Sequence, residues 1–326
     1  MRLTVLQTAE LLKQTRDVLI LTHKNPDGDT LGSGYALMYA LRALGKRAAV
    51  VCSDEIPAKY EYLNPEQVRQ KFEPKFIVSV DIADSVLLGE SLRRYENQID
   101  LCIDHHLSNR GYARNLLLRE DAAATCELML DVIEAMGVSL NKQIADCLYT
   151  GLVTDTGCFR YPSVTADTHR AAQKLISAGA ETTVIHQRMF ESVSQNKVAF
   201  LIEVMKQIRY ELNGECAILV LMRDTIHKFG VSEEELEGVS SIPRQIEGVR
   251  VGITIRQFRN YQGYKISVRT DGTVHASRIC SAFGGGGHIA AAGCTVQNLP
   301  LDQIYSDLLR IVSQELQAGS VKETGE

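Results

Sequence analysis

Tryptophan is absent from this chain, aromatic residues make up only 6% of it, and positive charge is not in excess. The formal net charge is −5 at pH 7. Long nucleic acids are held by many Lys and Arg contacts to phosphates and by aromatic side chains that stack on bases. The composition therefore argues against a surface that follows a long strand or a duplex, and it leaves room for a small anionic substrate held locally.

Two further absences limit the class of protein. The eight cysteines include no C-x-x-C pair, so neither a zinc ribbon nor a disulfide framework is predicted, and we expect buried thiols. No apolar run approaches the ~20 residues that a membrane-spanning helix needs. Residues 1–17 have the pattern of an amphipathic helix rather than of a signal peptide. We therefore expect a cytoplasmic protein with no membrane partner.

The first half of the chain alternates between predicted strands and helices. The apolar or β-branched runs that predict strands are residues 17–22, 47–52, 75–80 and 99–104. The patterns that predict helices are residues 31–45, 122–137, 142–155 and 165–180. This alternation predicts an α/β domain over residues 1–193, with a parallel sheet, helices on both faces and a ligand site at the carboxyl ends of the strands.

The pattern changes after residue 193. Residues 194–211 are predicted as a linker helix, and closure about this linker would exclude bulk water from a site. Strands are predicted at 216–222, 249–258 and 264–270, and a Ser232/Glu235 capping box predicts a short helix over 232–238. We expect a smaller mixed α+β domain over residues 212–316 and a flexible tail over 317–326.

Three side chains of metal-ligand type lie within the stretch LTHKNPDGDTLGS, residues 21–33, namely His23, Asp27 and Asp29. Because Gly28 separates the two aspartates, we expect a tight turn that aims their carboxylates at two different points. One ion cannot comfortably use both carboxylates. This loop therefore predicts half of a two-ion site.

The other candidate ligands follow other elements. They are Asp81 after one strand run, Asp104, His105 and His106 at the end of another, and Asp155 at the end of a helical stretch. Asp81 is the natural bridge between two ions. A mixed Asp/His set suits Mn²⁺ or a similar ion, and two ions ~3.5–4 Å apart can bind a phosphate and activate water. Taken singly, such aspartates are more often helix caps or turn residues, so the residues alone leave both interpretations open.

Five motifs occur in the order THKNPDGDTLGS, VDIADS, DHH, TDTGCFRYPSVTADT and FGGGGHIAAAG. Together they resemble the DHH phosphoesterase superfamily with its DHH-associated C-terminal domain, over about residues 17–296. Within it the chain most resembles the bacterial nano-RNase group, which degrades very short oligoribonucleotides and dephosphorylates 3′-phosphoadenosine 5′-phosphate. The resemblance implies a hydrolase with two divalent ions, expected to be Mn²⁺, that acts on such substrates from the 5′ end.

The resemblance also implies a role for each motif residue. The implied ligands are His23, Asp27 and Asp81 for one ion, and Asp29, Asp81, His105 and Asp155 for the other. Successive residues of an extended segment point to opposite sides, as His105 and His106 are expected to do. If His105 faces a metal, His106 is left to meet the substrate phosphate, and Asp104 can orient the pair from behind.

In the C-terminal domain, a glycine run ending in a histidine is too glycine-rich for a simple turn. It consists of Gly284, Gly285, Gly286, Gly287 and His288. Its backbone N–H groups can form a nest for an anion, whereas a flexible linker is the other interpretation; the resemblance makes it the substrate-binding loop. The resemblance also makes Arg269 a bidentate phosphate clamp. Arg256 is a further candidate substrate contact or an ordinary strand-face arginine, and Arg250, Arg259 and Arg278 are expected to be solvated charges.

Several alternative functions stay open at this point. A phosphodiesterase of cyclic or linear dinucleotides (c-di-AMP or pApA) and a RecJ-like single-strand exonuclease need the same metal motifs. A nucleotide sensor without turnover would have no reason to keep every ligand position. Inorganic pyrophosphatases share the N-terminal motifs, but the resemblance to their C-terminal domain is poor. We also expect a homodimer, because an exposed apolar face on the helix at 122–137 would suit one.

Overall fold

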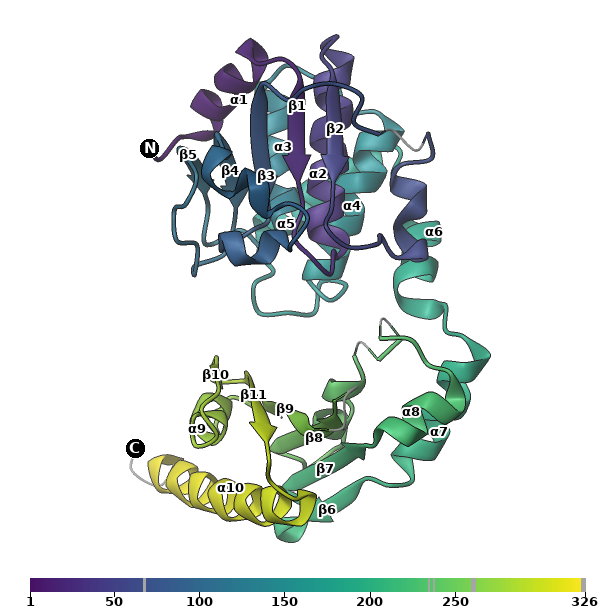
Figure 1. Cartoon of the computed structure of the whole chain (residues 1–326), viewed down its shortest axis with the longest axis vertical. Coiled ribbons are helices and arrows are strands. Elements are labelled where there is room, and N and C mark those ends of the chain that lie inside the picture. Colours follow the sequence, from purple (N-terminus) through teal and green to yellow (C-terminus); the bar gives the residue numbers. More distant parts are fainter. Residues whose placement is uncertain (67–68, 234, 237, 259–261, 324–326) are drawn as a thin grey trace. The chain divides into compact units, whose positions relative to one another are not determined.

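The structure, a computed structural model, describes the chain except residues 67–68, 234, 237, 259–261 and 324–326, and the side chains of 319–323. The chain divides into two compact units, Met1–Ser192 and Val193–Glu326 (Figure 1). Each unit has its own sheet and its own hydrophobic core. Among the described residues, every helix is too short or too polar to cross a lipid bilayer.

The first unit is built on a parallel five-stranded sheet in the order β2-β1-β3-β4-β5. The strands are β1 (Val18–Leu21), β2 (Ala48–Val51), β3 (Phe76–Val80), β4 (Leu101–Asp104) and β5 (Asn115–Leu118). The sequence predicted the first four, and it missed β5 because a short run of leucines has no β-branched residue to favour a strand. The strand order reverses between β1 and β3, where parallel sheets open a ligand crevice at their carboxyl ends.

The α-helices of the first unit contribute to one core on one face of this sheet. They are α1 (Val5–Gln14), α2 (Gly28–Ala43), α3 (Thr125–Ala135), α4 (Lys142–Asp155), α5 (Ala166–Ser177) and α6 (Thr182–His186), with the 3₁₀ helix η1 (Ala58–Leu63) and a π-helical turn, η4 (Gln187–Glu191). The other face carries the 3₁₀ helices η2 (Ser85–Leu88) and η3 (Arg93–Gln98) over Leu19, Leu21 and Ile77. We expected helices on both faces of the sheet. In the structure the α-helices cover one face, and the other face carries only short 3₁₀ helices among the described residues.

Helices α2 and α4 pack unusually closely because glycines line their contact. A Cβ atom added at Gly28 would lie 2.3 Å from Thr154 Oγ1. One added at Gly151 would lie 2.2 Å from Cys126 Sγ and 2.8 Å from Asp29 Oδ1. These distances are far below ordinary contact, so only glycine allows the helices to bring their polar ends together.

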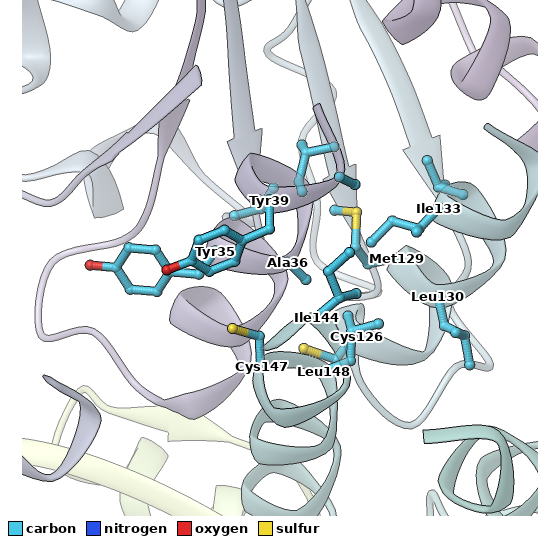
Figure 2. Close-up of a cluster of buried hydrophobic side chains, with 14 of the residues drawn as sticks. Tyr35, Ala36, Tyr39, Cys126, Met129, Leu130, Ile133, Ile144, Cys147 and Leu148 are labelled. Atoms are coloured by element: carbon cyan, nitrogen blue, oxygen red, sulfur yellow. The ribbon is translucent and has the colours of Figure 1, made fainter. Parts of the chain in front are cut away.

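Helix α3 completes this core and corrects one expectation. Figure 2 shows Met129 of α3 gathered with Ala36 of α2 and Leu148 of α4. Leu128, Met129, Leu130, Val132 and Ile133 are all at most 1% exposed. The expectation that this helix exposes an apolar face for a homodimer is therefore wrong, because α3 packs against α1, α2 and α4.

The second unit contains a mixed six-stranded sheet in the order β10-β11-β9-β8-β7-β6, in which only β7 and β8 run parallel among the described residues. The strands are β6 (Arg209–Glu211), β7 (Cys216–Leu221), β8 (Val251–Gln257), β9 (Gly263–Thr270), β10 (Gly286–Gly287) and β11 (Ala291–Gln297). The helices are α7 (Gln195–Met205), α8 (Arg223–Phe229), α9 (Ala276–Ser281) and α10 (Leu301–Glu323), with 3₁₀ turns η5 (Leu212–Gly214), η6 (Val239–Ser241) and η7 (Pro243–Gln245). One core packs α9 and α10 on the sheet, and a second packs α7 and α8 on β7.

Three local expectations for this unit differ from the structure. The predicted linker helix is shorter, and its Phe200 and Val204 are buried in the second unit. The Ser232/Glu235 capping box forms, yet the described residues of 232–238 are assigned no helix, and the next helical turn along the chain is η6. Helix α10 continues to Glu323, so the described part of the predicted tail is helical.

Candidate metal centre

The first ligand cluster is organised by the start of α2. Asp27 is the N-cap of this helix, and its Oδ1 accepts hydrogen bonds from the N–H groups of Asp29 (3.0 Å) and Thr30 (3.1 Å). Asp29 therefore lies in the first helical turn. The expectation of a tight turn at Gly28 is wrong, because the capping bonds of Asp27 begin a helix there. Gly28 is required by the close approach of Thr154 instead of by a turn.

His23 follows β1 and faces two carboxylates. Its Nδ1 lies 2.8 Å from the carbonyl oxygen of Lys24, which fixes the ring with Nε2 directed away. Nε2 lies 3.5 Å from Asp27 Oδ1 and 3.7 Å from Asp81 Oδ2. One potential ligand atom from each of His23, Asp27 and Asp81 falls within 4.8 Å of the others, so the three can hold one metal ion.

His105 follows β4 and is arranged in the same way. Its Nδ1 lies 3.0 Å from the carbonyl oxygen of Ala122. Its Nε2 lies 3.3 Å from Asp155 Oδ2 at the end of α4, and 4.0 Å from Asp29 Oδ2. His105, Asp29 and Asp155 form a second group that can hold an ion. A carbonyl that fixes one ring nitrogen and leaves the other for a metal is the usual support of a ligating histidine.

Asp81 lies between the two groups. Its Oδ2 faces His23 Nε2, whereas its Oδ1 lies 3.7 Å from His105 Nε2 and 3.5 Å from His106 Nδ1. The side chain is only 4% exposed, and the residue has a φ of +59°, a conformation that costs free energy for an L-residue. The two oxygens are thus divided between two sets of ligands, and the mixture of imidazole and carboxylate donors fits a pair of borderline divalent ions.

The crowding of carboxylates perturbs the pKa values of the protein without metal. Burial opposes a charge on His23, but Asp27 and Asp81 outweigh burial and raise the pKa of His23 to about 11. Burial and the charge of Asp81 raise the pKa of Asp155 to about 7 and that of Asp29 well above its usual value. The cluster therefore attracts positive charge, which protons or metal ions can supply.

The first and last residues of the DHH motif, Asp104 and His106, form a separate pair. Asp104 is buried, and its Oδ1 lies 2.8 Å from His106 Nδ1 while its Oδ2 accepts a 2.6 Å bond from Asn109 Nδ2. The Asp104 hydrogen bond outweighs burial and raises the pKa of His106 to about 9. The His106 side chain is 43% exposed, so its ring is held firmly yet stays accessible.

One further part of this centre was not predicted from the sequence. Thr125, at the start of α3, donates its hydroxyl to Asp81 Oδ1 (2.9 Å) and its N–H to Asp29 Oδ2 (2.6 Å). The N–H of Cys126 donates to Asp29 Oδ1 (2.8 Å). The one available signal was the run of alanines at 122–124, which lets the backbone come close to the carboxylates.

In the second unit, the glycine run forms a hairpin, so the predicted open nest is wrong. Gly284 and Gly285 donate their N–H groups to carbonyls of α9, and the N–H of His288 donates to Ala291. Gly286 and Gly287 form β10 against β11. Gly285 and Gly287 serve close packing, since an added Cβ would lie 2.3 Å from Cys294 Cβ at the first and 2.5 Å from the carbonyl oxygen of Ala291 at the second. The His288 side chain is exposed.

The two candidate arginines differ in their surroundings. Arg269 on β9 is half-buried and pairs in register with Ala291, the residue whose carbonyl accepts the N–H of His288. Arg256 on β8 is paired with Glu233 at 2.7 Å. Arg250, expected to be a solvated charge, instead bonds Glu215, so that expectation is wrong. Arg259 lies outside the described residues, and Arg278 is more than half exposed.

Comparisons with known proteins agree with the motifs. Residues 17–152 match the DHH family, N-terminal domain, and residues 213–318 match the DHHA1 domain. The chain is 32% identical over 317 residues to the bifunctional oligoribonuclease and PAP phosphatase NrnA of Thermus thermophilus, covering 94% of this chain and 93% of that protein. It is 25% identical over 300 residues to the protein of the same name from Bacillus subtilis, covering 90% and 94%.

A solved structure shows the same fold. The exopolyphosphatase-related protein of Bacteroides fragilis superposes with a TM-score of 0.83, at 22% identity and 96% coverage of both chains. At this identity the likeness concerns the fold alone. The resemblance predicted from the five motifs is confirmed by the family matches and the T. thermophilus relative. The chain therefore belongs to the DHH family of phosphoesterases, with an N-terminal DHH domain and a C-terminal DHHA1 domain.

Proposed function

We propose that this phosphoesterase degrades short oligoribonucleotides of about two to four nucleotides to mononucleotides and removes the 3′-phosphate of 3′-phosphoadenosine 5′-phosphate, because few phosphate contacts are available for a longer strand. The observation that carries the proposal is the division of the Asp81 carboxylate between two groups of metal-ligand side chains. The names of the relatives from T. thermophilus and B. subtilis support the choice of substrates.

We propose that the centre holds two divalent ions, with Mn²⁺ preferred because the ligands mix imidazole and carboxylate. The proposed ligands are His23, Asp27 and Asp81 for one ion, and Asp29, Asp81, His105 and Asp155 for the other. Two such ions supply charge for a phosphate, a lowered pKa for water and stabilisation of the oxygens of an in-line displacement. The buried Asp29 and Asp81 keep the ligand set fixed while substrates come and go.

His106 is proposed to contact the phosphate under attack. Because Asp104 accepts a hydrogen bond from its Nδ1, the ring has Nε2 left to donate to a phosphate, and the Asp104 carboxylate favours the charged form of the ring. A charged donor stabilises the negative charge that grows on a phosphate oxygen during displacement. Asp104 contributes by orientation and does not itself touch the substrate in this mechanism.

In the DHHA1 domain, Arg269 and His288 are proposed to hold the terminal phosphate of the substrate. Both adjoin Ala291, which is consistent with a shared anion contact. Several N–H groups of the glycine hairpin already donate to backbone carbonyls. We therefore propose that the hairpin shapes the surface beside His288 and does not itself bind the phosphate. Arg256 is a poorer candidate than the sequence indicated, because its guanidinium is paired with Glu233.

The test is a ladder of end-labelled oligoribonucleotides from two to about twenty nucleotides, digested with Mn²⁺ at two salt concentrations. We expect rapid removal of one mononucleotide at a time from the shortest substrates, a fall in rate with length, and a shallow dependence on salt. Rates that rise with length, or processive digestion, would contradict the proposal and favour a RecJ-like exonuclease. Preference for c-di-AMP or pApA over other dinucleotides and the bisphosphate nucleotide would favour the dinucleotide phosphodiesterase.

A matched pair of variants makes the test specific to the centre. Asp81→Ala should abolish turnover. Asp131→Ala should leave turnover unchanged, because Asp131 lies on α3 in the same unit and pairs with Arg119 instead of the cluster. Phosphate release from the bisphosphate nucleotide separates an enzyme from a nucleotide sensor. The homodimer and the cytoplasmic location stay predictions.

A further inference from the structure

The segment Ala122–Cys126 contacts the side chains of three of the proposed ligands through four hydrogen bonds. The bonds are Ala122 O to His105 Nδ1 (3.0 Å), Thr125 N to Asp29 Oδ2 (2.6 Å), Cys126 N to Asp29 Oδ1 (2.8 Å) and Thr125 Oγ1 to Asp81 Oδ1 (2.9 Å). Asp29 and His105 belong to the second metal group, and Asp81 is shared between the two groups. By contrast, His23 and Asp27 are supported by Lys24 and by the start of α2.

We propose that Thr125 is a positioning residue that sets the geometry of Asp29 and of the shared Asp81 carboxylate and so controls the affinity of the centre for its ions. This inference rests on the proposed metal centre. The four bonds hold the ligand atoms in place before any ion arrives, which lowers the cost of ordering them upon binding. Partners of this kind behind the ligands typically change metal affinity 10–100-fold when they are removed.

The hydroxyl of Thr125 has a particular effect on Asp81. By donating to Oδ1 it fixes the rotation of the carboxylate, so that Oδ1 stays on the side of His105 and Oδ2 stays on the side of His23. Each oxygen still has a second lone pair for an ion. Without the hydroxyl, the carboxylate would rotate more freely, and both of its oxygens would be held less well toward their ligand groups.

The segment is itself anchored away from the cluster. The buried Glu127 carboxylate accepts a bond from the N–H of Ala123 (3.4 Å) and one from the hydroxyl of Thr168 on α5 (2.9 Å). The position of Thr125 is therefore determined by the protein and does not depend on a bound ion. The alternative is that these bonds merely satisfy buried polar groups and stabilise the fold.

The experiment compares Mn²⁺ binding to full-length variants by calorimetry, without substrate, after removal of metal by a chelator. Thr125→Val removes the hydroxyl and keeps the shape, and Thr125→Ser keeps the hydroxyl. Thr8→Val is the matched control, because Thr8 is fully buried in the same unit and its hydroxyl has no partner among the described residues. Thermal unfolding of each metal-free variant reports any general loss of stability.

For the wild type we expect two binding events, and for Thr125→Val at least one of them weakened by about 10–100-fold, because the hydroxyl fixes the carboxylate that both groups share. Thr125→Ser and Thr8→Val should bind both ions like the wild type, and high Mn²⁺ should restore the activity of Thr125→Val. Two unchanged events in Thr125→Val would overturn the inference, even if its melting temperature fell. If Thr125→Val does not fold, Thr125→Ala is judged by the same criteria. Absence of Mn²⁺ binding by the wild type would instead refute the metal centre itself.

Discussion

Replacing Gly151 by alanine tests whether the close packing of α4 creates the metal centre. The new Cβ would lie 2.2 Å from Cys126 Sγ, 2.8 Å from Asp29 Oδ1 and 2.9 Å from Asp29 Cα, whereas ordinary contact is 3.4–4 Å. Neither neighbour can move cheaply, because both are buried and Asp29 is tied to Thr125 and Cys126. Overpacking of this kind costs about 1–3 kcal/mol. In a domain of about 150–250 residues, each kcal/mol lowers the melting temperature by about 2–4 °C.

The same displacement should weaken Mn²⁺ binding, because Asp29 must shift and a functional site tolerates only about 0.5 Å. The assays are thermal unfolding of the metal-free protein and Mn²⁺ titration. Gly34→Ala is the control on α2, since its Cβ would meet Thr22 Cγ2 at a milder 3.3 Å. If Gly151→Ala keeps both the stability and the Mn²⁺ affinity of the wild type, the reasoning about this contact is refuted.

Three other predictions follow from the site. Asp81→Ala should lose turnover more completely than Asp27→Ala at every Mn²⁺ concentration, since Asp81 is proposed to serve both ions, and full activity after metal stripping would contradict the two-ion account. In chelator, the folded protein binds more protons than the unfolded chain, because the pKa of Asp155 is raised to about 7 by burial and the pKa of His23 is raised to about 11 by Asp27 and Asp81. The melting temperature should therefore fall as pH rises from about 5 to about 9, and saturating Mn²⁺ should remove this trend; a rising melting temperature in chelator would contradict it. Arg269→Ala and His288→Ala should each raise KM about 10–100-fold, equivalent to roughly 1.5–3 kcal/mol, and leave Mn²⁺ binding unchanged, whereas loss of metal would make them ligands.

The sequence predicted the frame of the first unit well because hydrophobic periodicity determines it. The runs that became β1 to β4 and the patterns that became α2 to α5 are long enough, and regular enough, to indicate their elements. The candidate ligands were found for a related reason, since each follows the end of such an element. Helix α8 was missed because its seven residues are too few to show a clear period.

What the sequence could not provide was the backbone part of the centre. The N–H groups of Thr125 and Cys126 hold Asp29, but a backbone donor has no side chain that marks it. The predicted turn at Gly28 failed similarly, because the start of a helix and a tight turn both favour Asp and Gly. The prediction of a glycine nest failed because several N–H groups of this run donate to carbonyls of α9 and β11, and these partners are known only from the tertiary structure.

The most direct test of the account is the position of Mn²⁺ in crystals of the loaded protein, located by anomalous scattering. We expect two peaks about 3.5–4 Å apart, with the Asp81 carboxylate between them. The peak nearer His23 should also contact Asp27, and the other should contact His105 and Asp155. A single peak, or two peaks that do not share Asp81, would contradict the two-ion centre.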